Sequence, residues 1–307
     1  MQRIFITGGT GFFGKSILDY RLRHPESLRD AEITILSRNP AAFITANPHL
    51  ANQPGVAFVA GDVRTFNFST LQPFNVSTII HAATAAVTTL SDDEMYSTIV
   101  DGTRHVLEFA KTCGAKRILF TSSGAVYGPQ TAPVDEDTAT NPTTAYGRGK
   151  LAAERLCVES GVPSLIARCF AFTGPYLNRR IHYAIGNFIQ DCLDGKDIVI
   201  KGDGTPLRSY LYADDLVEWL FAILDRGEPG RPYNVGSPEG LSIRELAETV
   251  RSALGTKNEI SIQGAPQPFN HSTLQPSTYV PIVTRAENEL GLNVIVPLSE
   301  AIRKSAR

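Results

Sequence analysis

The stretch of sequence that decides the fold is TGGTGFFG, at residues 7–14. It follows a short apolar run at residues 3–7, which is typical of a buried β-strand. An amphipathic run at residues 14–23 comes after it and is typical of a helix. A glycine-rich turn between a first strand and a first helix is suited to bind the phosphates of a dinucleotide. The stretch therefore predicts an α/β protein with a dinucleotide at its first turn.

Each glycine of this turn has a task that a larger residue does not fill. Gly8 permits the tight passage from strand to helix, Gly11 lets a pyrophosphate approach the backbone, and Gly14 lets the helix pack on the strand. The helix that starts near Phe12 and Phe13 offers N–H groups and a partial positive charge to the phosphates. We expect these five residues to bind the cofactor.

The alternation of apolar and amphipathic runs continues through the first half of the chain. Further strands are predicted at residues 33–37, 56–60, 78–82, 117–122 and 164–168. Further helices are predicted at residues 92–113 and 144–160, with a short turn near 69–71. Near-continuous apolar strands that alternate with helices form a parallel sheet covered on both faces. The sequence thus predicts a Rossmann-type, doubly wound parallel sheet.

The pattern changes after residue 168, where Gly174 and Pro175 interrupt it. Helices are then predicted at residues 185–194, 214–224, 242–254 and 298–304, and strands at 197–201 and 232–235. We interpret this part as a smaller C-terminal α/β domain for the substrate. The predicted dinucleotide-binding domain comprises residues 1–171 and 211–235, and the substrate domain comprises residues 172–210 and 236–307.

Composition argues against several classes of protein. The 307 residues include 29 Lys+Arg and 31 Asp+Glu, so the net charge is -2, without the basic excess of a nucleic-acid-binding protein. No apolar run approaches the ~20 residues of a membrane-spanning helix, and we expect no signal peptide. The four cysteines form no CxxC pair, so we expect thiols in a reducing cytoplasm and no metal site.

A Tyr-x-x-x-Lys pattern, from Tyr146 to Lys150, lies in the predicted helix at residues 144–160. Residues four apart share one face of a helix, about 6 Å apart along its axis. A free tyrosine has a pKa of about 10 and does not exchange its proton readily at neutral pH. A nearby ammonium favours the phenolate and lowers that pKa. The pair is therefore suited to acid/base chemistry at Tyr146 with Lys150 assisting, although the pattern alone is common on helices.

Three segments together resemble the extended short-chain dehydrogenase/reductase family, which contains nucleotide-sugar epimerases, dehydratases and reductases. They are the Gly-x-x-Gly-x-x-Gly spacing of the first turn, SSGAVYG at residues 122–128, and the Tyr146–Lys150 pair. The resemblance implies hydride transfer between a nicotinamide cofactor and a sugar carbon, while Tyr146 moves the proton on the sugar oxygen. It also implies that Ser123 hydrogen-bonds that oxygen, and that Thr121, Tyr146 and Lys150 contact the cofactor.

The end of the second strand bears on the choice of cofactor. An acid there accepts hydrogen bonds from the ribose of NAD, but this strand ends in Ser37 and Arg38. A hydroxyl and a guanidinium suit a 2′-phosphate, so we predict NADP, with NAD as the alternative. The resemblance adds four cofactor contacts, which are Asp62, Val63, Ala82 and Ala83.

The segment GDGTPLRSYLYADD, at residues 202–215, resembles a segment of nucleotide-sugar enzymes that binds the substrate diphosphate. The resemblance implies that Arg208 clamps the diphosphate, a task suited to a bidentate donor. It implies that Asn187 also contacts this group. Two positions depart from the family pattern, because Ala171 and Ile99 stand where the family commonly has asparagine.

Members of this family commonly form homodimers through two helices, and we expect a homodimer here. The corresponding helices are residues 95–113 and 145–160, whose apolar faces line either a seam between two chains or an ordinary contact with the sheet. The candidate seam residues are Val106, Leu107, Ala110, Ala153, Leu156 and Cys157.

The residues after Ser123 separate the reactions of the family. Dehydratases and decarboxylases carry an acid there, where this chain has Gly124 and Ala125, so elimination lacks its proton shuttle. A reductase exchanges NADPH, whereas an epimerase retains NAD, and Arg38 therefore favours a 4-ketoreductase of a nucleotide-linked 4-keto-6-deoxy sugar. The alternatives are a UDP-glucose 4-epimerase-like enzyme and, less favoured, a dTDP-glucose 4,6-dehydratase-like enzyme. A non-catalytic dinucleotide-sensing protein is the alternative of another class.

Overall fold

The computed structural model describes the chain apart from residues 1, 27, 29–30, 73–75, 85–89, 181–182 and 265–276. The chain divides into two compact units, and each draws on separate segments of sequence. The first unit comprises Met1–Gly128, Ala139–Cys169 and Val217–Tyr233, and the second comprises Pro129–Thr138, Phe170–Leu216 and Asn234–Arg307. The main differences from the predicted boundaries are at residues 129–138 and 211–216, which belong to the second unit.

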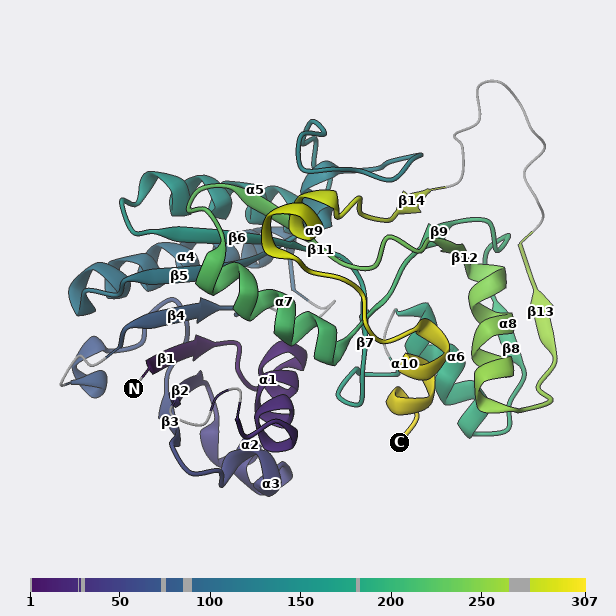
Figure 1. Cartoon of the computed structure of the whole chain (residues 1–307), viewed down its shortest axis with the longest axis horizontal. Coiled ribbons are helices and arrows are strands. Elements are labelled where there is room, and N and C mark those ends of the chain that lie inside the picture. Colours follow the sequence, from purple (N-terminus) through teal and green to yellow (C-terminus); the bar gives the residue numbers. More distant parts are fainter. Residues whose placement is uncertain are drawn as a thin grey trace. The chain divides into compact units, whose positions relative to one another are not determined.

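A seven-stranded sheet with the strand order β11-β6-β5-β4-β1-β2-β3 forms the centre of the first unit (Figure 1). Its strands are β1 (Gln2–Thr7), β2 (Ala31–Ser37), β3 (Val56–Ala60), β4 (Thr78–His81), β5 (Arg117–Ser123), β6 (Ser164–Cys169) and β11 (Pro232–Val235). The first six of these strands pair in parallel. The chain runs outward from β1 to β3 and then returns to the other side of β1 at β4. The predicted doubly wound sheet is confirmed, and its topological switch point lies between β1 and β4.

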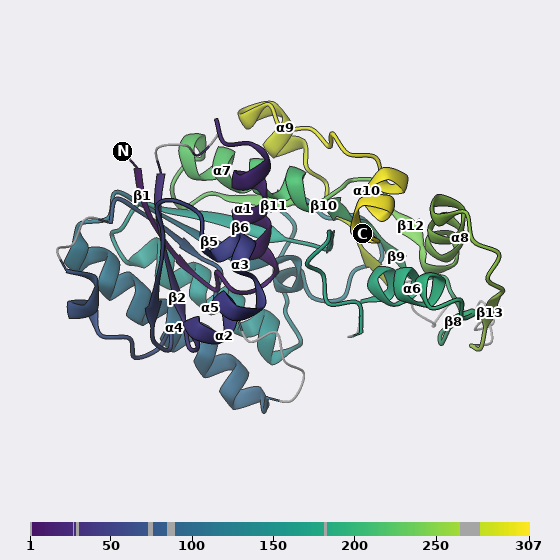
Figure 2. The same ribbon diagram turned by 90° about the horizontal axis from the view of Figure 1, so that it is seen from below.

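Helices cover both faces of this sheet (Figure 2). On one face lie α4 (Asp92–Cys113) and α5 (Ala145–Glu159). On the other face lie α1 (Phe12–Arg23) and the first-unit part of α7 (Ala213–Arg226). The hydroxyl of Tyr20 in α1 donates a hydrogen bond of 2.8 Å to Glu218 in α7 and so joins these two helices. The short helices of this unit are α2 (Pro40–Ala46), α3 (Pro48–Ala51), η1 (Phe68–Leu71) and η2 (Gly124–Tyr127).

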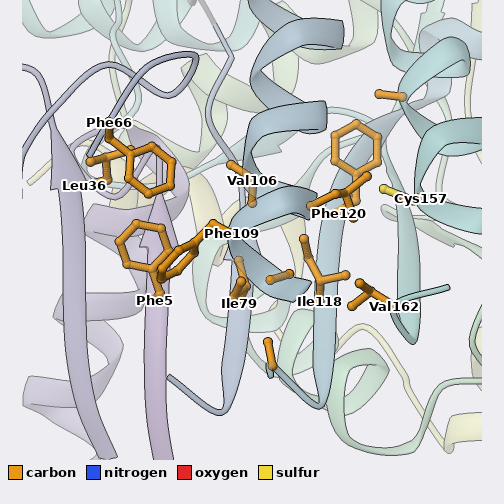
Figure 3. Close-up of a cluster of buried hydrophobic side chains, with 14 of the residues drawn as sticks. Phe5, Leu36, Phe66, Ile79, Val106, Phe109, Ile118, Phe120, Cys157 and Val162 are labelled. Atoms are coloured by element: carbon orange, nitrogen blue, oxygen red, sulfur yellow. The ribbon is translucent and has the colours of Figure 1, made fainter. Parts of the chain in front are cut away.

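Apolar side chains of the sheet, α4 and α5 form one buried cluster (Figure 3). Phe5 of β1 and Ile79 of β4 pack with Val106 and Phe109 of α4, and the rings of Phe5 and Phe109 are 5.1 Å apart.

The candidate seam residues belong to this cluster. Five of them are buried in it, and Leu156 is half-buried and packs against it; the five are Val106, Leu107, Ala110, Ala153 and Cys157. They therefore cover the sheet of their own chain. For these five residues the sheet-packing alternative is confirmed and the seam alternative is wrong, whereas for the half-buried Leu156 both stay predictions.

The second unit has its own core among α6 (Ala184–Leu193), α8 (Ile243–Leu254) and α10 (Leu298–Ser305). A capping box of Ser242 and Glu245 starts α8. The strands of this unit are short and include β7 (Phe172–Thr173), β8 (Ile198–Ile200), β9 (Leu207–Arg208), β10 (Leu211–Tyr212), β12 (Leu241–Ser242), β13 (Ile260–Ile262) and β14 (Thr278–Tyr279). They pair as β10-β7, β12-β9-β14 and β13-β8, and α9 (Thr284–Leu290) follows β14.

We predict that Gly14→Ala destabilises the first unit, although alanine is the better helix former. An added Cβ at Gly14 would lie 2.2 Å from the Cα and the carbonyl oxygen of Gly9, and backbone atoms do not yield easily. The expected loss in the free energy of unfolding, measured by urea titration, is about 2 kcal/mol or more. Gly202→Ala is the matched control, because a Cβ there meets nothing within 4 Å. An equal loss in both variants would contradict this explanation.

Candidate active site

The glycine loop between β1 and α1 touches the turn that follows β4. Gly8 has a φ of 74°, and an added Cβ there would lie 2.5 Å from the carbonyl carbon and oxygen of Ala82. Glycine fits this position because it accepts a left-handed backbone and has no Cβ. The N–H of Ala83 donates a hydrogen bond of 3.3 Å to Oγ1 of Thr7. The structure therefore brings the predicted contacts Gly8, Ala82 and Ala83 together at the switch point of the sheet.

A buried histidine ties this turn to β1 and α4. Oγ1 of Thr7 lies 2.7 Å from Nδ1 of His81, and Oγ1 of Thr103 lies 3.0 Å from Nε2. Because Thr103 donates its hydroxyl proton to the Ile99 carbonyl, Nε2–H of His81 donates to Thr103 and Nδ1 accepts from Thr7. Burial, and then the charge of Lys150, lowers the pKa of His81 to about 3. His81 is therefore neutral and has a structural role.

Two observations show that the loop fits a dinucleotide. Gly11 is the N-cap of α1 and has no side chain to cap the helix, and the first turn of α1 carries no acid that would repel phosphate. Thr84, just after the β4 turn, has a buried hydroxyl with no hydrogen-bond partner among the described residues. A buried hydroxyl needs a hydrogen-bond partner, and a bound group at this turn would supply one. The pyrophosphate would lie at Gly11 and at the first helical residues, Phe12 and Phe13.

The end of β2 carries a hydroxyl and a guanidinium. Ser37 is buried and its Oγ accepts a hydrogen bond of 3.2 Å from the N–H of Asn39, whereas Arg38 is exposed. Asp62, after β3, forms an ion pair of 3.0 Å with Arg64. Burial raises the pKa of Asp62, but the hydrogen bonds and charge of Arg64, with the charge of Arg38, lower it below its usual value. The Asp62 carboxylate therefore stays ionised, in contact with Arg64 and within the field of Arg38.

Helix α5 brings Tyr146 to the end of β5. Thr144 caps the helix, because its hydroxyl accepts a hydrogen bond of 3.0 Å from the N–H of Gly147. An added Cβ on Gly147 would lie 2.6 Å from the carbonyl oxygen of Ala125. Since only glycine allows this approach, α5 packs directly on η2. Tyr146 therefore lies on the turn of α5 that packs against the segment after Ser123.

Lys150 is buried, with 2% of its surface exposed. Its Nζ donates a hydrogen bond of 2.7 Å to the carbonyl of Thr121, and it lies 4.9 Å from the ring centre of Phe120 and 5.8 Å from that of Tyr146. Burial lowers the pKa of Lys150 to about 8, although nearby thiols and a carboxylate act in the opposite direction. The side chain is therefore still cationic at neutral pH, beside the phenol whose ionised form it favours.

Ser123 ends β5 and is 4% exposed. Its Oγ accepts a hydrogen bond of 3.2 Å from the N–H of Ala125. Gly124 and Ala125 open η2, so this turn has no carboxylate beside Ser123. The predicted residues Thr121, Ser123, Tyr146 and Lys150 thus gather at the carboxyl end of β5 and the start of α5, while Val63 packs against the cluster of Figure 3.

The two residues predicted to contact the substrate diphosphate belong to the second unit. Asn187 lies on α6 and is half-buried. Arg208 lies on β9, where its guanidinium donates to the carbonyls of Leu207 at 2.7 Å and Ser277 at 2.9 Å. Ala171, at the position of the missing asparagine, packs against the core of this unit. The roles of Asn187 and Arg208 in substrate binding stay predictions.

Sequence analysis missed a buried ion pair in the first unit. Nη2 of Arg168 lies 2.9 Å from Oε2 of Glu154, Nε lies 3.1 Å from Oε1, and both residues are buried. Burial lowers the pKa of Arg168, but the hydrogen bond and charge of Glu154 raise it above its ordinary value. The available signal was the position of Glu154, four residues after Lys150 on the same face of α5. A charged residue on a buried face needs a partner.

Several further findings bear on chemistry. Within the described ranges, no three His, Cys, Asp or Glu side chains gather into a group that would hold a metal ion. None of the described helices is both long and apolar enough to cross a membrane. All four cysteines are present as thiols.

Comparisons with known proteins relate this geometry to a family. UDP-glucuronic acid decarboxylase 1 of Xenopus tropicalis is 28% identical, over 99% of this chain and 71% of the relative. The crystal structure of dTDP-glucose 4,6-dehydratase from Bacillus anthracis with NAD superposes with a TM-score of 0.84 at 21% identity, over 100% of this chain and 96% of that one. UDP-glucuronic acid 4-epimerase from Bacillus cereus, with UDP-glucuronic acid and NAD, gives a TM-score of 0.83 at 22% identity, over 99% and 98%.

The two structural likenesses establish the shared fold. A match to a family model shows more than the fold. Residues 4–236 match the model described as "NAD dependent epimerase/dehydratase family". That match runs from β1 through the glycine loop, Ser123 and the Tyr146–Lys150 pair to the residue after β11. The chain therefore belongs to the NAD dependent epimerase/dehydratase family of enzymes.

Proposed function

We propose that this protein is an NADPH-dependent 4-ketoreductase of a nucleotide-linked 4-keto-6-deoxy sugar. The end of β2 carries the proposal, because Ser37 and Arg38 stand there in place of a carboxylate. The exposed Arg38 offers a forked and permanently charged donor for the 2′-phosphate of NADP. A reductase consumes NADPH in each turnover and must exchange it, so a site for NADP favours net reduction over internal recycling of NAD.

A nucleotide sugar is the proposed substrate, because the relatives are named for such compounds. The decarboxylase is named for UDP-glucuronic acid, and the two solved structures for dTDP-glucose and UDP-glucuronic acid. We assign the diphosphate contacts to Arg208 and Asn187. Arg208 suits this task because a guanidinium binds two phosphate oxygens at once.

The residues at the end of β5 have distinct tasks in this proposal. Bound at the glycine loop, the dinucleotide supplies a hydride to the sugar carbon. Ser123 donates a hydrogen bond to the keto oxygen and holds it in place. Tyr146 donates its phenolic proton to that oxygen, and the ammonium of Lys150 stabilises the phenolate that remains. Lys150 and Thr121 also help to hold the cofactor.

A 4-epimerase with tightly held NAD is the second candidate. The turn of Gly124 and Ala125 favours it as much as the reductase, because neither reaction needs an acid after Ser123. Decarboxylation and dehydration are less favoured because that acid is missing. A non-catalytic dinucleotide sensor does not explain why Ser123, Tyr146 and Lys150 are all retained around one strand end.

We also propose that the protein forms a homodimer and works in the cytoplasm. The buried faces of α4 and α5 are used within the chain, so a dimer contact would use their outer faces. Tyr96 of α4 and Val158 of α5, at 41% and 55% exposure, are the large apolar residues available there.

We expect the purified protein to oxidise NADPH when it meets a matching 4-keto-6-deoxy sugar from a panel linked to dTDP, CDP, GDP or UDP. Tyr146→Phe should lower kcat about 100-fold or more, because it removes the proton donor. Tyr20→Phe is the control, since its phenol bonds Glu218 at 2.8 Å on the opposite face of the sheet, and should leave kcat unchanged. Bound NADPH with no oxidation by any panel member would contradict the reductase, and retained NAD with epimerised product would favour the second candidate.

Arg38→Ala should weaken NADPH binding by about 10- to 100-fold, because it removes charge-assisted hydrogen bonds to the 2′-phosphate. Binding of NADH, which lacks that phosphate, should change little. Fluorescence titration with each nucleotide measures both effects. Arg23→Ala, an exposed arginine paired with Asp19 in α1, serves as the control and should bind both nucleotides normally. A parallel loss of NADH and NADPH in Arg38→Ala would argue against a 2′-phosphate contact.

The buried Lys150 should make the unfolding free energy of the cofactor-free protein rise with pH. Its pKa is lowered from 10.5 to about 8 on folding, so between these values the unfolded chain binds more protons and stability rises with pH. From about pH 8 to about pH 10, the wild type should gain about 2 kcal/mol in unfolding free energy relative to Lys150→Met. Lys116→Met, at an exposed lysine, should show no such difference from the wild type. Equal pH profiles for the wild type and Lys150→Met would refute the shifted pKa.

A further inference from the structure

One buried ion pair of the first unit, Glu154 with Arg168, contacts side chains on both sides of Ser123. Glu154 accepts a hydrogen bond from the hydroxyl of Ser122 and two from Arg168, at 3.1 and 2.9 Å. Arg168 also donates from Nη1 to the phenolic oxygen of Tyr127 at 3.1 Å. Exposure is 5% for Glu154, 7% for Arg168, 2% for Ser122 and 1% for Tyr127, so the whole group lies away from water.

The positions of these contacts along the chain show what they hold. Ser122 directly precedes Ser123, and Tyr127 ends the η2 turn that Ser123 caps. Arg168 stands opposite Ser122 in the parallel pairing of β5 and β6. The segment that carries Ser123 is thus held at both ends by one ion pair.

The same carboxylate is attached to the helix of the proton donor. Tyr146, Lys150 and Glu154 are spaced by four residues on α5, so they follow one face of that helix. A hydrogen bond from Ser122 to Glu154 therefore joins the strand end of Ser123 to the helix of Tyr146. Because both partners are buried, this bond exchanges with water far less readily than a surface bond does.

Stability alone does not explain a buried ion pair. Desolvation of two charges commonly offsets their attraction, and apolar residues of similar volume often serve stability as well or better. Such a pair does fix geometry, since a forked guanidinium and a carboxylate accept few relative orientations. In the proposed reaction, the hydroxyls of Ser123 and Tyr146 both hydrogen-bond the same substrate oxygen. The rate of such a reaction is sensitive to geometry, because a displacement of about 1 Å can lower it up to about 100-fold.

We infer that Glu154 is a positioning residue, which holds Ser123 at a fixed place relative to Tyr146 through the hydrogen bond from Ser122. This inference rests on the proposed roles of Ser123 and Tyr146. Glu154 itself contacts neither substrate nor cofactor in this account and acts only through Ser122 and Arg168.

The test removes one hydrogen bond and leaves the charges paired. Replacing Glu154 would leave the guanidinium of Arg168 buried without a carboxylate, a change that strongly destabilises the fold. Ser122→Ala deletes the hydrogen bond to Glu154 while the Glu154–Arg168 pair remains. Ser164→Ala is the matched control, because Ser164 is also 2% exposed and bonds the carbonyls of Cys157 and Val162 at the other end of the neighbouring strand.

Steady-state kinetics distinguish a positioning role of Glu154 from a role in stability alone. They are measured with the panel substrate that the wild-type protein reduces. Both variants should lose a few degrees of Tm, as expected for one buried hydrogen bond. Ser122→Ala should lower kcat about 10-fold with KM changed less than about two-fold, because substrate binding persists while the two hydroxyls lose alignment. Ser164→Ala should keep the kcat of the wild type. Equal kcat values in Ser122→Ala and the wild type would overturn the inference.

A second measurement needs no substrate. The N–H of Ala125 donates to Oγ of Ser123, so its hydrogen exchange reports whether the segment stays in place. Exchange in the peptide covering residues 123–127 should be faster in Ser122→Ala than in the wild type and in Ser164→Ala. Unchanged exchange there would contradict the holding role of Glu154. If the wild type reduces no sugar, the proposed function fails, while the exchange measurement still decides whether Glu154 holds this segment.

Discussion

The approach of the backbone at Gly8 to the backbone at Ala82 is the constraint on which the first unit depends. A Cβ at Gly8 would overlap the Ala82 carbonyl, so the two turns at the switch point pack without intervening side chains. Thr7 and His81 then join the same two strands by a buried hydrogen bond. These contacts bring the glycine loop beside β4, which in turn pairs with β5, the strand that ends at Ser123. The glycine loop and Ser123 therefore lie at the same edge of the sheet.

Two buried charged residues of opposite sign lie on α5. Lys150 and Glu154 both lie on the inner face of α5, but only Glu154 has a partner of opposite charge at hydrogen-bonding distance. Glu154 is paired with Arg168 and keeps its charge partner at hydrogen-bonding distance. Lys150 has a carbonyl and aromatic rings for neighbours, and burial lowers its pKa. In our proposal the first arrangement fixes geometry, and the second leaves a cation beside the ring of Tyr146.

Much of the fold was predictable because its signals are local. Apolar runs predicted the strands of the first unit, and their alternation with helices predicted the parallel, doubly wound topology. The helices α2 and α3 were missed because each has fewer than eight residues, although a proline begins both. Spacing along one helix identified Tyr146 and Lys150. No spacing pairs Glu154 with Arg168, which lies on another element, and an apolar helix face looks the same whether it covers a sheet or a second chain.

Each unit is assembled from three separate stretches of the chain. The strand β11 pairs beside β6, yet it is made more than sixty residues after β6, at Pro232–Val235. During translation the β6 edge therefore emerges from the ribosome before the strand that pairs with it, and an unpaired edge strand is open to other chains. No single cut in the chain separates the two units, because their segments alternate along the sequence.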